Sequence, residues 1–170
     1  DGEVKLRSRN GLDWTGDFPE VAQAVRALPV HDARLDGELV VLDAQGRSDF
    51  AALQRVIDGS SKQPLRYIVF DLPGVAGVDI SRAPLRERKA LLKALIGTEP
   101  GTLASTDHVV DHGPAAFAAS GAAGFDGIVS KQAAAPHVPT RPRSRVTVQH
   151  DFGRASCAGS GPTTLLAVTC

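Results

Sequence analysis

The fold is organised around residues 35–43, which read Leu-Asp-Gly-Glu-Leu-Val-Val-Leu-Asp. The Asp-Gly pair is a turn signal, and the short apolar run after it contains β-branched residues, so we predict a buried strand over residues 34–42. Glu38 stands at the start of this run. Because a desolvated carboxylate without a partner is strongly unfavourable, Glu38 is expected to face a polar pocket, solvent or a cation. From this stretch alone, a strand-edge glutamate in water stays an open alternative.

The composition is that of one globular domain with balanced charge. At 170 residues and 42% hydrophobic content, the chain is long enough to bury a core. Basic and acidic residues number 19 each, so no overall basic charge indicates nucleic acid, although a local basic stripe would suffice. Cys157 and Cys170 show neither metal nor disulfide spacing. The absence of a membrane-length apolar run and of a signal-peptide pattern favours a cytoplasmic location.

Periodicity and turn residues predict an alternation of short strands and helices. Asn10-Gly11 marks a tight turn, and Pro73-Gly74 is expected to close a strand. In the first strand Lys5, Arg7 and Arg9 alternate with other residues, which makes one face basic. The expected strands are 3–8, 34–42, 65–72, 108–110 and 127–131, and the expected helices are 19–28, 50–57, 84–96 and 114–120.

The chain changes character after Gln132. Residues 136–145 mix prolines with arginines, and residues 151–170 are rich in Gly, Ser, Thr and Ala without a helical or strand period. Segments of this kind bury too little apolar surface to offset the entropy of ordering. We therefore predict a folded domain over residues 1–131 and a poorly ordered tail over residues 132–170.

Four stretches carry a resemblance to a known family. They are Ser8-Arg9-Asn10-Gly11, residues 35–43, residues 67–72 and residues 124–131, and the linking segments 47–54 and 84–89 match as well. In this order and spacing they resemble the adenylation domain of ATP-dependent DNA ligases, most closely the bacterial end-joining type, over about residues 3–145. Such ligases transfer AMP from ATP to a lysine and then to the 5′-phosphate of a DNA nick, and seal the nick with release of AMP.

The resemblance implies an α+β fold in which antiparallel sheets are flanked by helices and the nucleotide lies between the sheets, as in ligase-type, ATP-grasp-like nucleotidyltransferases. The alternation of elements by itself is also compatible with α/β. The resemblance further implies ATP and Mg²⁺ or Mn²⁺ as cofactors. The implied partner is nicked or broken duplex DNA, with a role in DNA repair and recombination by end joining in the bacterial cytoplasm.

The resemblance also implies roles for five residues. Glu38 would serve the ribose and the metal, and Phe70 would stack on adenine, as any aromatic face can do for a base. Asp126 would take the metal-binding carboxylate position, and Lys131 would lie near the phosphates. Arg9 would contact a nucleotide or DNA phosphate through its planar guanidinium. This chemistry suits adenylyl transfer, which builds negative charge around the α-phosphate.

Two parts of the family pattern are missing. The family's nucleophile motif, Lys-x-Asp-Gly, lies more than ten residues ahead of the Ser-Arg-Asn-Gly turn, whereas here Asp1-Gly2 lies too close to that turn. Lys5 lies within a strand and is not assigned as the nucleophile, so no catalytic residue is assigned. After Arg145 the family usually reads Asp-Trp-Leu-Lys-Val-Lys, but this chain reads Val146-Thr147-Val148-Gln149-His150. A reading-frame shift after Arg145 and divergence of a disused copy both explain this ending. At Asp126 the family usually carries glutamate.

Three hypotheses follow from this pattern. The first is the core of a ligase adenylation domain, truncated and unable to form enzyme–AMP by itself. The second is a binding module that keeps an ATP- or DNA-binding face through the basic strand and Arg141–Arg145, with strong salt dependence. The third is a nonfunctional product whose sheet lacks a strand and tends to aggregate. An RNA ligase or RNA-capping enzyme shares the chemistry, so the broad class is safer than the substrate.

Overall fold

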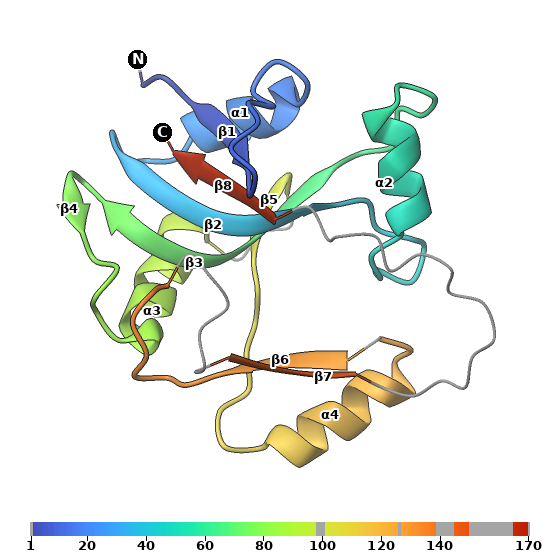
Figure 1. Ribbon diagram of the computed structural model, residues 1–170, viewed down its shortest axis with the longest axis vertical. Helices are drawn as coiled ribbons and strands as arrows, with labels where there is room; N and C mark the ends of the chain where they lie inside the picture. The colour runs from blue at the N-terminus through green and yellow to red at the C-terminus, as the bar shows by residue number, and fades with distance from the viewer. Residues whose placement is uncertain (1, 98–100, 126, 139–144, 150–164, 170) are drawn as a thin grey trace.

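The computed structural model describes residues 2–97, 101–125, 127–138, 145–149 and 165–169. Its elements follow the order β1 (Lys5–Ser8), α1 (Pro19–Arg26), β2 (Ala33–Val40), α2 (Phe50–Ile57), β3 (Arg66–Val75), β4 (Val78–Asp79), α3 (Leu85–Ile96), β5 (Leu103–Ser105), α4 (Gly113–Ala122), β6 (Gly127–Lys131), β7 (Arg145–Gln149) and β8 (Leu165–Thr169) (Figure 1). Within the described ranges, no helix has the length and apolarity needed to cross a lipid bilayer.

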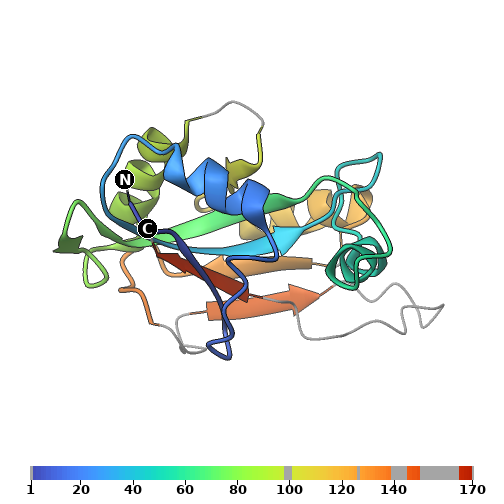
Figure 2. The ribbon, with the colours of Figure 1, turned by 90° about the horizontal axis from the view of Figure 1, so that it is seen from above.

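The strands form two sheets. The larger has the order β1-β8-β2-β3-β4 with β5 beside β3, and the smaller consists of β6 and β7. Only the β3–β5 pairing is parallel among the strand pairs described. Helices α1 and α3 cover one face of the larger sheet, whereas β6 and β7 lie on its other side (Figure 2). The expected α+β fold with antiparallel sheets and flanking helices is confirmed.

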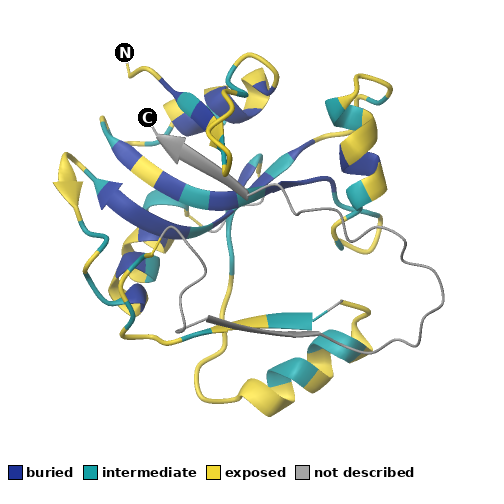
Figure 3. Cartoon of the chain, viewed as in Figure 1, coloured by how far each residue is buried: buried dark blue, intermediate teal, exposed yellow. Residues whose placement is uncertain are grey.

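The core lies between the larger sheet and helices α1 and α3. Alternate residues of β2 are buried, among them Leu35 and Leu39, because successive side chains of a strand point to opposite faces. They pack in one cluster with Tyr67 and Val69 of β3 and with residues of α1, α2 and α3. Figure 3 shows this burial concentrated on the larger sheet and its helices. The opposite face of β2 is left for Asp36 and Glu38.

Gly37 is not part of a turn, contrary to the expectation from the Asp-Gly pair. It lies inside β2, opposite Val69 of β3. A Cβ atom on Gly37 would come within 2.6 Å of the Ile68 carbonyl oxygen and 2.8 Å of the Tyr67 ring. The glycine is therefore needed for close approach of β3, a role that local sequence does not distinguish from a turn.

Two other strand predictions differ from the structure. Pro73-Gly74 does not close β3, which runs on to Val75 and turns through Ala76 and Gly77 into β4. The β2–β3 register is irregular between Arg34 and Asp36, where Pro73 lies opposite, and such irregularities tolerate a residue without an N–H. The strand predicted at 108–110 lies earlier, at 103–105, where it pairs with β3.

The predicted tail contains regular structure. Residues 145–149 pair with β6 as β7, and residues 165–169 form β8 between β1 and β2. No strand was predicted after residue 132, because backbone pairing partners distant in sequence leave no local signal. The predicted poor order of residues 139–144 and 150–164 lies outside the described residues.

Candidate functional site

Glu38 lies on the face of β2 that points away from the core. It is half-buried and opposite Ile68 of β3, whereas its neighbour Leu39 is buried opposite Tyr67. Asp36 is on the same face, two residues earlier, and is also half-buried. The strand therefore presents two carboxylates toward the side of the sheet on which β6 and β7 lie.

Phe70 occupies a β-bulge of β3. Asp36 pairs with Asp71 and Gly37 pairs with Val69, so Phe70 is the extra residue on β3. Bulges re-aim side chains and are frequent beside functional sites. Phe70 is half-buried, unlike Val69 and Asp71 on either side of it. Its ring is therefore available on the face that Glu38 shares, rather than being part of the core.

Lys131 ends β6, and its side chain meets Phe70. The Nζ atom lies 4.6 Å from the centroid of the Phe70 ring, within the range of a cation–π interaction. The structure therefore brings together two predicted site residues from different sheets. The contact joins the smaller sheet to the face of β3 that lies opposite the core.

Lys89 of α3 is a nearby cation that sequence reasoning missed. Its Nζ atom donates to Thr106 Oγ1 at 3.0 Å and to the Thr106 carbonyl oxygen at 3.3 Å. Burial lowers the pKa of Lys89, and the positive charge of Lys131 lowers this pKa further, against Asp71 and Asp107, which raise it. The sequence predicts only that Lys89 lies in the helix over residues 84–96, so its interaction with the Lys131 charge is revealed by the fold.

Asp71 anchors β3 beneath this site. Arg88 of α3 donates to both of its carboxylate oxygens, from Nε at 2.8 Å and from Nη2 at 2.9 Å. Burial would raise the pKa of Asp71, but the hydrogen bonds from His137 and Arg88 and the Arg88 charge outweigh burial and hold that pKa well below its usual range. The carboxylate is thus charged at neutral pH and paired.

Arg9 and Lys5 lie apart from this contact, on β1 and in the turn after it. Arg9 is exposed in the turn after β1, which is closed by hydrogen bonds between Ser8 and Leu12. Lys5, the alternative considered for the nucleophile, forms an ion pair with Glu3 at 3.3 Å. Asp126 lies outside the described residues.

The described residues contain no group of three or more His, Cys, Asp or Glu side chains that could hold a metal ion. Mg²⁺ needs fewer protein ligands when a nucleotide is present, because it is commonly held by one or two carboxylates together with substrate phosphates. Glu38 and Asp36 fit that incomplete ligand set, although both take part in other interactions here.

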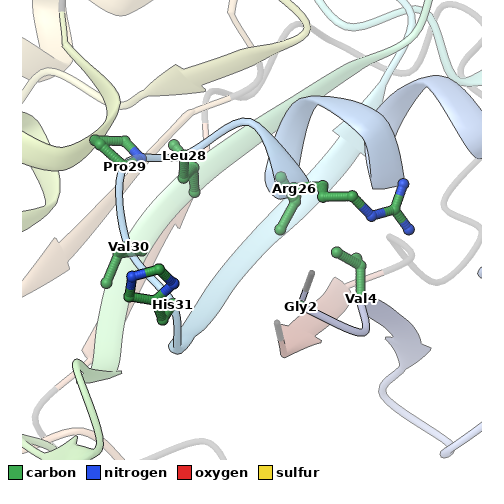
Figure 4. Close-up of a pocket in the computed structure, with 8 residues that line it drawn as sticks. Gly2, Val4, Arg26, Leu28, Pro29, Val30 and His31 are labelled. Carbon is green, nitrogen blue, oxygen red and sulfur yellow. The ribbon is translucent and has the colours of Figure 1, made fainter.

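A pocket of about 410 Å³ lies elsewhere, beside the start of the chain and the end of α1 (Figure 4). Its lining includes Arg26 and His31 but no carboxylate, and is otherwise composed of Gly2, Val4, Val25, Leu28, Pro29 and Val30. None of the predicted site residues lines it. The pocket is therefore separate from the contact between Phe70 and Lys131.

Comparison with known families matches residues 1–146 to the ATP dependent DNA ligase domain. The multifunctional non-homologous end joining protein LigD of Pseudomonas aeruginosa is 37% identical over 133 residues, which are 78% of this chain and 16% of that protein. DNA ligase C of Mycobacterium tuberculosis is 32% identical over 177 residues, 94% of this chain and 48% of that protein. The chain therefore spans less than half the length of these two relatives.

Solved structures show the same likeness. The ligase domain of M. tuberculosis LigD superposes with a TM-score of 0.72 at 25% identity, covering 88% of this chain and 51% of that chain. A mycobacterial DNA ligase D complexed with ATP and MES gives a TM-score of 0.71 at 27% identity, covering 88% of this chain and 52% of that chain.

Proposed function

Because this chain belongs to the family of ATP-dependent DNA ligase domains, we propose that it is the nucleotide-binding core of an adenylation domain that acts on broken or nicked DNA in bacterial end joining. The observation that carries the proposal is the Lys131 Nζ atom 4.6 Å from the Phe70 ring centroid, beside the carboxylate face of β2. An aromatic face, a cation and a carboxylate are the groups that a nucleotide's base, phosphates and ribose require.

In this proposal Phe70 stacks on adenine. The ring face that accepts the Lys131 cation is electron-rich and becomes free for a base when that side chain moves away, and stacking on such a face is worth about 1–3 kcal/mol per base. Lys131 leaves the ring to meet the phosphates, and Lys89 adds a second cation near them. Glu38 binds the ribose, and Arg9 contacts a phosphate of the nucleotide or the DNA.

A divalent cation, Mg²⁺ or Mn²⁺, would neutralise charge on the phosphates when bound. Glu38 and Asp126 are the proposed protein ligands, with Asp36 as a neighbouring carboxylate. The role of this chain's own residues is to supply oxygen ligands at the nucleotide and to leave the remaining positions to phosphate and water.

We further propose that residues 1–170 by themselves bind ATP without becoming adenylylated. Its sequence contains no Lys-x-Asp-Gly, and a nucleophilic lysine must be desolvated or placed beside other cations to attack at neutral pH. Lys5 is paired with Glu3 and 43% exposed, so it lacks that environment. Lys89 has it, but its Nζ atom donates to Thr106 Oγ1 and to the Thr106 carbonyl oxygen.

The test combines ATP titration with intact-mass spectrometry in Mg²⁺ or Mn²⁺. We expect the chain to bind ATP and to form no AMP adduct. K131A should weaken ATP binding about tenfold, because one charge-assisted contact is lost. K62A is the matched control because Lys62 is exposed in a loop. Undetectable ATP binding by a folded sample would refute the proposed site, and a covalent adduct would refute the absence of a nucleophile.

A DNA-binding remnant is the second candidate. Arg7 of β1 and Arg9 in the turn after it are both exposed, where they are available for phosphate contacts. Binding to nicked duplex DNA should weaken steeply with salt, with a slope reduced by about one when one phosphate-contacting arginine is removed. DNA binding that is undetectable, or that does not respond to salt, would remove this candidate.

A further inference from the structure

Asp71 and Arg88 form a buried ion pair that is also connected to another segment of the chain. The Asp71 and Arg88 side chains are 5% and 1% exposed, so the pair is removed from water. Arg88 Nη1 donates to the carbonyl oxygens of Ser81, Ala83 and Ala135. A buried guanidinium is thus satisfied on all sides, and one of its carbonyl partners comes from the segment that follows β6.

That segment, residues 132–138, is called the strap here. His137 Nδ1 lies 3.0 Å from Asp71 Oδ2, and the His137 backbone N–H donates to the Ser81 carbonyl at 2.7 Å. The strap is therefore held at its far end by the same carboxylate that binds Arg88.

The strap also caps α3. The first N–H groups of a helix lack partners within the helix, and Pro84 at the N-cap supplies no side-chain bond. Instead, the Leu85 N–H donates to the Ala135 carbonyl at 3.1 Å and the Arg86 N–H donates to the Ala133 carbonyl at 3.0 Å. The helix that carries Arg88 and Lys89 and the strap are consequently bound to each other along several residues.

Lys131 directly precedes the strap. Consecutive Cα atoms are about 3.8 Å apart, so the anchor at Ala133 confines the backbone of Lys131 to a small region. The side chain of Lys131 meets Phe70, the neighbour of Asp71 on β3. The neighbouring β3 residues Phe70 and Asp71 therefore contact the two ends of this connection. The Phe70 ring contacts Lys131, and the Asp71 carboxylate contacts His137.

We propose that Asp71, Arg88 and His137 form a latch that positions Lys131 over Phe70 by holding the strap against α3. His137 is a positioning residue, because it acts on the site through the strap, by its contacts with Asp71 and the Ser81 carbonyl. The consequence for ATP binding rests on the proposed function, whereas the geometry of the latch can be tested without ATP.

The test uses NMR of the full chain. A proton held over an aromatic ring is shifted upfield, so the ε-methylene protons of Lys131 report their distance from Phe70, with F70L identifying the ring's contribution. Hydrogen exchange at the Leu85 and Arg86 amides reports whether the strap remains on α3. These readouts are compared in wild type, in H137A and in H137N, whose amide nitrogen reproduces the Nδ1 donor. H31A, at an exposed histidine, is the matched control.

We expect H137A to lose the upfield shift and to exchange both amides about tenfold faster, since a hydrogen bond to a charged group is lost. H137N should restore both, and H31A should change neither. ATP affinity should fall in H137A, because the strap no longer keeps the Lys131 backbone where its side chain, once it leaves the ring, reaches the phosphates. K131A should abolish that effect in a double-mutant cycle. Should H137A not fold, H137Q replaces it, because the longer amide mimics Nε2 rather than Nδ1.

Two results would overturn the latch. One is that H137A speeds exchange of the two amides but leaves the Lys131 chemical shift unchanged, because the strap would then cap the helix without influencing the site. The other is unchanged amide exchange in H137A. Absence of ATP binding in wild type, with the NMR results as expected, would refute the proposed function and leave the positioning of Lys131 established.

Discussion

The larger sheet with α1 and α3 and the smaller sheet with α4 are stabilised in different ways. The first contains the buried cluster of Leu35, Leu39, Tyr67 and their neighbours. Helix α4 has no buried residue, and Val129 of β6 is 47% exposed. Among the residues of α4 and β6, whose burial is described, the smaller unit has no buried side chain. The strap and the Lys131–Phe70 contact connect it to the larger sheet and α3. The candidate site lies where the two meet.

The largest effect is expected at the ion pair beneath the site. D71A leaves the Arg88 guanidinium buried without its partner, which should lower the free energy of unfolding by about 3–5 kcal/mol. Urea denaturation measures this loss of unfolding free energy. R86A is the control, because Arg86 is exposed and its guanidinium lies 3.9 Å from the Glu87 carboxylate. Equal effects of the two substitutions would show that the pair does not secure the larger sheet.

The next prediction compares a glycine-to-alanine substitution in each of the two units. G37A introduces a Cβ against backbone and the Tyr67 ring and should destabilise by about 1–3 kcal/mol. G113A, at the start of α4, meets nothing within 4 Å and should be neutral or stabilising by up to about 1 kcal/mol. Thermal unfolding of both variants checks this contrast, and a tolerated G37A would contradict the close approach of β3.

The third prediction concerns acid. The folded pKa of Asp71 is lowered, so its contribution to stability is complete above its unfolded pKa of about 4 and is lost as the pH falls below that value. The melting temperature of wild type should therefore fall more steeply below pH 4 than that of D71N. Parallel pH profiles would show that Asp71 is not the responsible carboxylate.

The smallest effect is expected on β6. V129T should change the free energy of unfolding by less than about 0.5 kcal/mol, because the side chain is largely exposed. V69T, in the core at 0% exposure, should cost about 1–3 kcal/mol through a buried hydroxyl. A large effect of V129T would mean that the smaller unit has a core of its own.

Local patterns identified three of the six strands described in the larger sheet, β1, β2 and β3. The apolar run at residues 34–42 and the amphipathic helix ahead of Gly97 are signals within single segments, and the structure confirms both with shifted ends. The role of Gly37 was misread, because a glycine in a turn and a glycine under an aromatic ring look alike in sequence. Strands β7 and β8 were missed since their partners are distant along the chain.

The candidate site likewise has features that the sequence predicted and features that depend on the fold. Residue types and motif order were enough to select Glu38, Phe70 and Lys131 and, by resemblance, the family. The bulge that turns Phe70 out of the core, the closeness of Lys89 to Lys131 and the His137–Asp71–Arg88 contacts depend on strand register and on chain segments far apart in sequence. Periodicity describes one segment at a time, whereas these contacts exist only once the segments have packed together.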